Sequence, residues 1–396
     1  MKLQHNVILF YWISFLKSCL FLLPIWYFFF TNYLNFWIAD AILINTFWWL
    51  SIFLFEIHSW SWADRFWRKR VYFIWLLLCI IGFLFYLFST SISLFLLSSF
   101  LLWAWYAFTS WNLEALIHDN FEERWMQENY DTVLWNQYII QFLWRAISSL
   151  CAWYLFLYNE LYPAIASILC YMIAVLLLFF IKSTKQKLSN EKTNFIHIKK
   201  TLLFLYERKK MLYMVIFWGL LLSWLANIYW YTYQPYLEYI WVNIKDIWVT
   251  YFFISLFSAA WSYILKKIQN KVPSFTILHS LFLLLVIVSF MFYVFNNIFW
   301  LIPIIILSIL FGFIMILWNT YLIKYSPKDC KSTILSIFWL SASLGAFIFW
   351  TTTWYMVELF TIEKVYSFLP FIILFISLLW LVFYKKITKE LNQSNF

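Results

Sequence analysis

The sequence predicts an all-α integral membrane protein with about twelve transmembrane helices. Of the 396 residues, 65% are hydrophobic and 12% are charged, which leaves too few polar side chains to coat a water-soluble globule. Apolar runs recur along the whole chain, and each is close to the ~20 residues that a helix needs to cross a bilayer. Because backbone groups in lipid must bond within their own segment, each run is expected to be helical.

The expected spans alternate with polar connections along the chain. They cover residues 6–31, 35–58, 71–90, 94–118, 133–158, 161–182, 210–235, 246–266, 274–296, 299–324, 332–356 and 364–385. The first run is too long for the core of a secretory signal peptide, so it is expected to remain as one helix. The expected domains are a six-helix lobe over 1–182, a basic cytoplasmic connector over 183–209, a second six-helix lobe over 210–385 and a cytoplasmic tail over 386–396.

The basic residues predict the orientation of these spans. With the N-terminus placed in the cytoplasm, 24 of the 28 Lys and Arg residues fall at the chain ends or in cytoplasmic connections, and the other four are Lys17, Arg145, Lys245 and Lys364. This bias predicts an even number of spans with both termini in the cytoplasm. The net charge of +10 therefore reflects membrane topology, and no nucleic-acid partner is expected.

The connection between the second and third spans carries the most specific motif. It reads Trp60, Ser61, Trp62, Ala63, Asp64, Arg65, Phe66, Trp67, Arg68, Lys69 and Arg70, and it follows Glu56, Ile57, His58 and Ser59. With glycine in place of Trp60 and Trp67, this stretch resembles the loop 2-3 signature of the major facilitator superfamily, Gly-x-x-x-Asp-Arg-x-Gly-Arg-Lys. Residues 111–119, 229–236 and 331–336 resemble parts of helices 4, 7 and 11 in the same family. The resemblance implies two six-helix lobes with a solute site between them near the bilayer midplane.

The same resemblance implies a conformational latch at the inner side of the membrane. In the family, the acid of this loop faces the N-terminus of helix 11, where the helix dipole favours a negative charge. The loop arginine pairs with an acid at the inner end of helix 4. Carried over to this chain, the latch residues are Trp60, Asp64, Arg65, Trp67, Arg68 and Asp119. The alternative is a solvated basic loop that contributes only to topology.

The tryptophan and glycine counts are inverted. The chain has 28 Trp and only 4 Gly, whereas genuine Trp should gather at the membrane interfaces and Gly should be frequent in transmembrane helices. Trp103, Trp144, Trp153, Trp224 and Trp318 instead fall inside expected spans. We therefore hypothesise that many of these positions are glycine codons, most simply UGA, that have been read as Trp. The alternative is an AT-rich, aromatic-rich protein in which these tryptophans are real.

Four ionisable residues within or beside the expected spans are candidates for binding solute or coupling ions: Lys17, Glu56, Glu114 and Arg145. Charges within the membrane are costly and mark functional sites by default. Lys17 lies on the first helix, which lines the cavity in the family, and is a candidate for binding an anionic group. Glu56 and Glu114 are candidates for carrying a coupling proton. The alternative is structural pairing, for instance between Arg145 and Glu114.

Polar residues of the seventh span complete the list of site candidates. They are Asn227, Tyr233 and Gln234. Helix packing or anchoring at the membrane interface is the alternative for the tyrosine, and a bond to a neighbouring helix for the asparagine. No spacing typical of metal ligands, nucleotide-binding loops or catalytic nucleophiles is found, so no metal, cofactor or enzymatic activity is expected.

These observations predict a secondary active transporter that moves a small solute by alternating access, as a monomer in the cell membrane. A proton or another ion is the expected coupling partner. Efflux of amphipathic compounds is suggested by the resemblance, with uptake of nutrients or anions left open. The antiporter signature of helix 5, a Gly-Pro pair, is not found between Trp144 and Trp153. The alternative function is an intramembrane enzyme or lipid scramblase, for which only Glu114, His118 and Asp119 come near one another in sequence.

Overall fold

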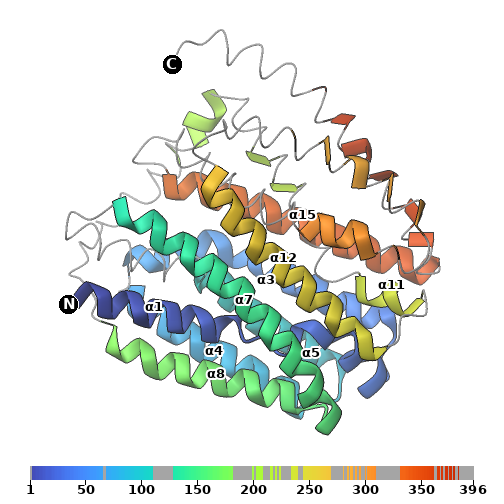
Figure 1. The fold of residues 1–396 in the computed structure, drawn as a ribbon, viewed down its shortest axis with the longest axis horizontal. Coiled ribbons are helices and arrows are strands. Elements are labelled where there is room, and N and C mark those ends of the chain that lie inside the picture. The colour runs from blue at the N-terminus through green and yellow to red at the C-terminus, as the bar shows by residue number, and fades with distance from the viewer. Residues whose placement is uncertain are drawn as a thin grey trace.

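The described part of the chain is helical and contains no strand (Figure 1). The computed structural model describes residues 2–65, 68–109, 128–181, 233–239, 244–268, 301–308 and 331–360, with short pieces between 199 and 223, between 280 and 299 and between 364 and 382. The helices are α1 (Lys2–Ser18), η1 (Leu23–Ile25), α2 (Trp26–Phe28), η2 (Phe29–Tyr33), α3 (Ile38–Arg65), α4 (Arg68–Phe88), α5 (Ile92–Thr109), α7 (Glu128–Tyr158), α8 (Tyr162–Phe180), α11 (Tyr233–Tyr239), α12 (Ile244–Ile268) and α15 (Lys331–Leu359).

Six segments among the described residues are long and apolar enough to cross a membrane. They are His5–Tyr33, Ile38–Glu56, Lys69–Phe88, Trp135–Tyr158, Tyr162–Phe180 and Ile337–Leu359. Two shorter apolar helices, Ile92–Ala104 and Trp248–Ile264, coincide with the expected fourth and eighth spans. The count of twelve spans and the cytoplasmic termini stay predictions, because the other expected spans lie wholly or partly outside the described residues.

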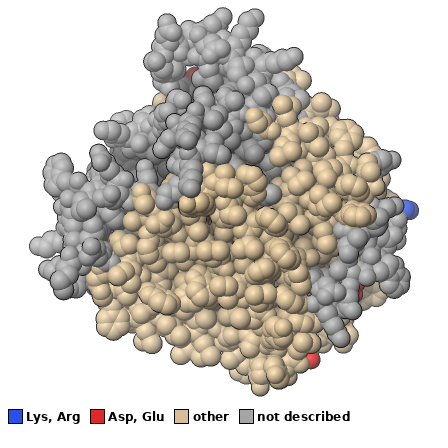
Figure 2. All heavy atoms as spheres, viewed as in Figure 1, with Lys and Arg blue, Asp and Glu red and all other residues tan. Residues whose placement is uncertain are grey.

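The surface of the helices suits a hydrocarbon environment. Figure 2 shows a broad face on which almost no described side chain is charged. On α8 the exposed positions are large and apolar: Ile165, Leu169, Met172, Ile173, Leu176, Phe179 and Phe180. Such a contiguous apolar surface is rare on soluble monomers and is expected where helices contact lipid.

Among the described helices, two pairs join the first part of the sequence to the last part. We call residues up to 181 the first half and those from 199 onward the second half. Helix α3 packs along α15, and α7 packs along α12 (Figure 1). Within the first half, α3 and α4 pack on α5, and α1 and α4 pack on α8. We call the boundary between the two halves the seam. The pairs α3–α15 and α7–α12 lie on either side of it.

The connection between α3 and α4 is shorter than the sequence predicts. Helix α3 runs past the expected end of the second span to Arg65, and α4 begins at Arg68. Most of the motif expected in a loop is thus continuous with the two helices. Helix formation can extend here because the sequence as read contains no proline and has tryptophan, where the family has glycine, at positions 60 and 67.

The first span is not the single helix that its apolar run predicts. Helix α1 ends at Ser18, and the chain then makes short turns before η1, α2 and the π-helix η2. Pro24 accounts for the break, because a proline inside a helix lacks an N–H and its ring clashes with the carbonyl four residues earlier, here that of Leu20. The span is retained, but its helix is discontinuous.

Glycine is used where two helices approach closely. A Cβ added at Gly345 of α15 would lie 2.8 Å from Leu220 Cδ2 and 3.1 Å from Leu220 Cα. A Cβ at Gly82 of α4 would lie 2.7 Å from Leu102 Cγ on α5. These distances leave no room for a side chain, as is common at helix crossings in membranes.

Replacing Gly345 with leucine is expected to lower the free energy of unfolding by about 1–3 kcal/mol, because the new side chain overpacks the crossing at Leu220. Thermal unfolding in detergent would measure the change. Leu344→Trp is the matched control, since Leu344 is 37% exposed and its change is expected to stay within about 0.5 kcal/mol. Equal stability of Gly345→Leu and the native protein would contradict the close crossing.

Candidate functional site

The residues of the expected latch are placed only by their backbone or lie outside the described residues. Trp60, Asp64 and Arg65 belong to the end of α3, and Arg68 opens α4. Their side chains are not among those described. Trp67, Glu114, Asp119 and Asn227 lie outside the described residues. The latch and the pairing of Arg145 with Glu114 therefore stay predictions.

Lys17 lies in the last turn of α1, directly before the break in the first span. Its backbone carbonyl accepts a hydrogen bond of 3.1 Å from the Tyr171 hydroxyl on α8. Its ammonium is close enough to the Cys79 thiol on α4 for an electrostatic interaction. A cation in the last turn stabilises the unpaired carbonyls of a helix C-terminus. This geometry gives Lys17 a structural role at the break, and contact with an anionic solute stays a prediction.

Glu56 and Arg145 are the other two ionisable candidates that the structure describes. Glu56 is 2% exposed on α3, at the end of the apolar segment Ile38–Glu56. Arg145 is half-buried on α7, and its guanidinium carbon lies 5.6 Å from the centre of the Phe142 ring. That distance is typical of a cation–π interaction. Both residues lie on helices that form the seam between the halves.

Gln234 makes an extensive polar contact between the two halves among the described residues. It lies on α11 and is completely buried, and all its backbone partners belong to the break in the first span. The Tyr27 N–H donates to Gln234 Oε1 at 3.3 Å. Gln234 Nε2 donates to the carbonyls of Pro24 at 3.0 Å and Leu23 at 3.4 Å. It also donates to the Tyr233 hydroxyl at 3.2 Å.

The Gln234 amide occupies a gap in the hydrogen-bond ladder of the first span. In a regular helix the Tyr27 N–H would donate to the Leu23 carbonyl four residues earlier. Ile25 departs from helical geometry, with φ −129° and ψ 11°, and both groups instead bond to the amide from α11. Unbonded backbone groups within a membrane are costly. The sequence predicts that Gln234 binds solute. In the structure its amide instead bonds to the backbone of the first span, which explains the polar side chain without a solute.

A second contact supports the same junction. The Tyr27 side chain interacts with the carboxylate of Glu238, one turn beyond Gln234 on α11. Next to it, Phe29 and Phe30 pack edge-to-face against Phe95 of α5, with ring centres 6.3 and 5.5 Å apart. The segment that follows the break is thus held by apolar contacts to the first half and by polar contacts to α11.

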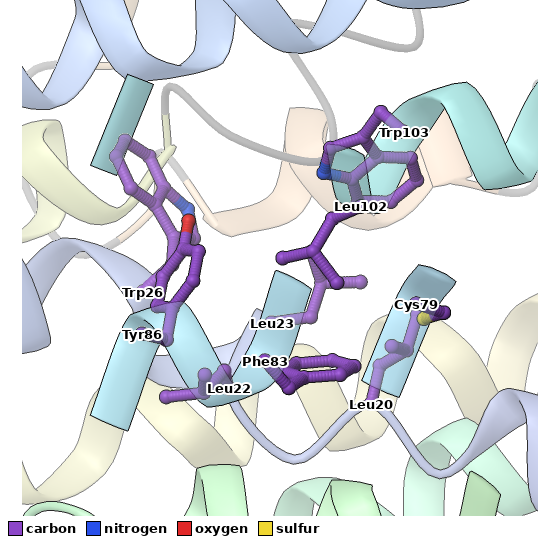
Figure 3. A pocket seen from close by; sticks show the side chains of 9 residues that line it. All are labelled: Leu20, Leu22, Leu23, Trp26, Cys79, Phe83, Tyr86, Leu102 and Trp103. Atoms are coloured by element: carbon purple, nitrogen blue, oxygen red, sulfur yellow. The ribbon is translucent and has the colours of Figure 1, made fainter. Parts of the chain in front are cut away.

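A small apolar cavity lies beside the break (Figure 3). Its volume is about 60 Å³, and its lining comes from the break, α2, α4 and α5. The lining residues are Leu20, Leu22, Leu23, Trp26, Cys79, Phe83, Tyr86, Leu102 and Trp103. Sites for small molecules usually measure about 300–1,000 Å³. This cavity is therefore too small for a solute and leaves open space next to the discontinuous helix.

The break in the first span and the bonds of Gln234 to it were not predicted from the sequence. Pro24 within an apolar run was the available signal, because proline interrupts a helix at the preceding turn. No sequence signal joined Gln234 to residues 23–27, since more than two hundred positions separate them.

Comparison with known proteins agrees with this architecture. The model of the Major Facilitator Superfamily matches residues 7–349. No curated protein matches the sequence. Similar solved structures include the POT family transporter PepTSo, with a TM-score of 0.77 and 12% identity over 98% of this chain and 99% of that chain. The nucleoside transporter NupG has a TM-score of 0.73 and 14% identity over 96% and 99%.

A D-xylose-proton symporter has a TM-score of 0.73 and 11% identity over 97% of each chain. At such low identities these three likenesses establish the fold alone. The family model covers most of the chain, including α3, α7, α12 and α15 as far as residue 349. The chain therefore belongs to the major facilitator superfamily and is a transporter of the membrane rather than an enzyme.

Proposed function

We propose that the chain is a secondary active transporter that moves a small solute by alternating access. Two six-helix lobes would rock about the seam and expose a central site to one side of the membrane at a time. The observation that carries this proposal is the packing of α3 on α15 and of α7 on α12. Two pairs that flank one seam let the halves tilt while remaining in contact.

The proposed orientation follows the basic residues. Lys69 Nζ, at the start of α4, donates to the backbone carbonyls of Phe179 and Ile181 at the end of α8, at 3.0 and 2.7 Å. This end of the bundle also carries Arg70 and the N-terminus of α1 (Figure 1). By the positive-inside rule it is the cytoplasmic end of a protein with both termini inside. The opposite end, where α11 lies, is then the outer one.

The proposed solutes are small and organic. NupG is a nucleoside transporter, another POT family structure is a complex with 5-aminolevulinic acid, and a third relative is a D-xylose-proton symporter. For this chain we extend the range to amphipathic compounds moved outward, as the resemblance of the loop motif suggests. A proton is the proposed coupling ion, and a monomer in the cell membrane is the proposed working form.

Counterflow in liposomes would test the function. Purified protein would be reconstituted and preloaded with one unlabelled solute from a panel of nucleosides, dipeptides, pentoses and amphipathic cations. Saturable uptake of the same labelled solute, absent from protein-free liposomes, is the expected result. If every solute failed while labelled lipid crossed the bilayer or was chemically altered, the scramblase or enzyme alternative would replace transport.

Glu56→Gln is expected to abolish solute accumulation driven by a pH gradient while leaving counterflow within about threefold of the native rate. A glutamine at this buried position cannot carry a proton, whereas exchange of solute for solute needs no net proton movement. Both rates can be measured in the same liposomes with and without an imposed gradient. The matched control is Glu358→Gln, because Glu358 is exposed near the end of α15. Accumulation equal to that of the control would remove Glu56 from the coupling step.

A further inference from the structure

We propose that Gln234 is a gating residue. Its amide closes the α11 end of the transporter by bonding to the broken first span, and we call this contact the Gln234 gate. Opening that end requires the amide to withdraw from residues 23–27. The inference rests on the proposed alternating access, and it assigns the closing contact at one end to a specific side chain. Gln234 thereby becomes a positioning residue instead of a solute ligand.

The bonds of Gln234 join the two halves directly. Three of its four hydrogen bonds go to backbone groups of the first span, at 3.0, 3.3 and 3.4 Å. The fourth goes to Tyr233 on its own helix and fixes the orientation of the amide. The amide offers one acceptor oxygen and two N–H donors, so Oε1 accepts from the Tyr27 N–H while the two N–H groups serve the carbonyls of Leu23 and Pro24, one N–H being shared with the Tyr233 hydroxyl.

The break separates two sets of anchors. Before it, α1 is tied to α8 of the same half, through the Tyr171 hydroxyl on the Lys17 carbonyl at 3.1 Å. Within it, the Phe21 N–H donates to Ser167 Oγ of α8 at 3.2 Å. From Leu23 onward, the polar partners change to Gln234 and Glu238 of α11. The change of partner falls at the discontinuity, so the contact with α11 can be broken without unwinding α1.

The contact is suited to reversible opening. It contains uncharged hydrogen bonds, and water can replace the amide on the same backbone groups once a path is open. Phe29 and Phe30 stay packed on Phe95 of α5, so the segment after the break is expected to remain with the first half. Withdrawal of the amide therefore separates α11 from the first span along this junction.

A distance measurement tests the Gln234 gate without knowledge of the solute. The five native cysteines would be replaced by alanine or serine. Spin labels would be placed at Tyr158→Cys, the last residue of α7, and at Phe360→Cys, directly after α15. These side chains are 84% and 46% exposed, and both helices end on the side where α11 lies (Figure 1). Pulsed electron paramagnetic resonance in lipid nanodiscs then gives the populations of short and long distances.

Gln234→Met is expected to raise the ratio of long to short distances about tenfold, because it keeps the length of the side chain and removes every hydrogen bond. Tyr233→Phe keeps the three bonds to the first span and is expected to give a smaller shift in the same direction. Gln141→Met on α7 is the control for the loss of a glutamine side chain, since Gln141 is half-buried on α7, away from the first span and α11 in sequence. Its distance distribution is expected to equal that of the native side chain.

A purely structural role predicts a different outcome. Gln234→Met would then lower the unfolding temperature while its distance distribution matched that of Gln141→Met. That outcome would disprove the Gln234 gate. If Gln234→Met did not fold, Gln234→Glu would take its place, since a carboxylate cannot donate and a protonated carboxyl donates only one hydrogen bond, so the two carbonyls cannot both be satisfied and the same end is expected to open. If the Gln234 gate is wrong, the distances stay unchanged. If the proposed function is wrong, no counterflow is seen in the liposome assay.

Discussion

Peptide sequencing of the protein purified from its native host is expected to show glycine at positions 60, 67, 103 and 350. Each is a tryptophan in the translated sequence. The first two complete the loop signature of the family. Positions 103 and 350 lie in α5 and α15, where the structure shows how tightly a tryptophan side chain is packed.

The packing of α3 on α5 explains the expectation for position 103. The ring centres of Trp48 and Trp103 are 3.2 Å apart, whereas aromatic pairs in proteins are usually separated by about 4.5–7 Å. A glycine at either position would remove this crowding and permit the close approach that Gly82 permits between α4 and α5. Trp350 is completely buried in α15, five residues after Gly345, which makes a close crossing of its own.

Trp12 and Trp37 are the internal controls. They are 52% and 82% exposed, and Trp37 lies between the first span and α3, where an interfacial tryptophan is expected. Both should be tryptophan in the purified protein. Tryptophan at all four tested positions would refute the codon hypothesis, and the loop between α3 and α4 would then need a geometry different from that of the family.

Asp64→Asn is expected to reduce the rate of solute counterflow about ten- to hundredfold while leaving membrane insertion intact. The resemblance to the family places this acid opposite the N-terminus of the eleventh helix, which corresponds to α15 (Lys331–Leu359). Loss of the carboxylate charge removes its attraction to the helix dipole. Couplings between conformational states are typically worth about 1–3 kcal/mol, which is the size of the expected change. Counterflow and the yield of folded protein would be measured in parallel.

Asp40→Asn provides a matched control on the same helix. Asp40 lies in the first turn of α3, and its Oδ2 accepts a hydrogen bond of 3.3 Å from the Trp37 N–H. Asparagine also serves at helix N-termini, so this variant is expected to transport at the native rate. Equal rates for Asp64→Asn and Asp40→Asn would show that the charged stretch contributes only to topology.

The helical class and the helix positions were predictable because a bilayer imposes a simple rule on composition. Runs of apolar residues near the length of a membrane span must be helical, and the expected spans over residues 35–58, 71–90, 133–158 and 161–182 coincide with α3, α4, α7 and α8. Helix ends were less predictable. The charged residues after position 58 were expected to leave the second span, yet α3 continues to Arg65 because helix termini can extend beyond the lipid.

Two of the residues expected at the site, Tyr233 and Gln234, lie at the junction with the first span, and their contact with solute stays a prediction. Gln234 and Tyr233 were selected because they place an amide and an aromatic ring on the expected seventh span, and the structure shows both fully buried at the junction with the first span. Their suggested contact with solute was inferred from the side chains alone. The sequence offers no means of recognising that a backbone gap near Pro24, far away along the chain, supplies partners for the same amide.

Hydropathy and the charged loop motif are enough to identify a helical membrane transporter of the major facilitator superfamily, because both belong to short stretches of sequence and both are recognisable without the family's glycines. The helices that form the seam, the position of the break in the first span and the side chain that fills the gap are known only from the folded chain. Those features depend on contacts between distant segments. Backbone groups freed by Pro24 must find partners in the dry interior, and the folded chain supplies them from α11.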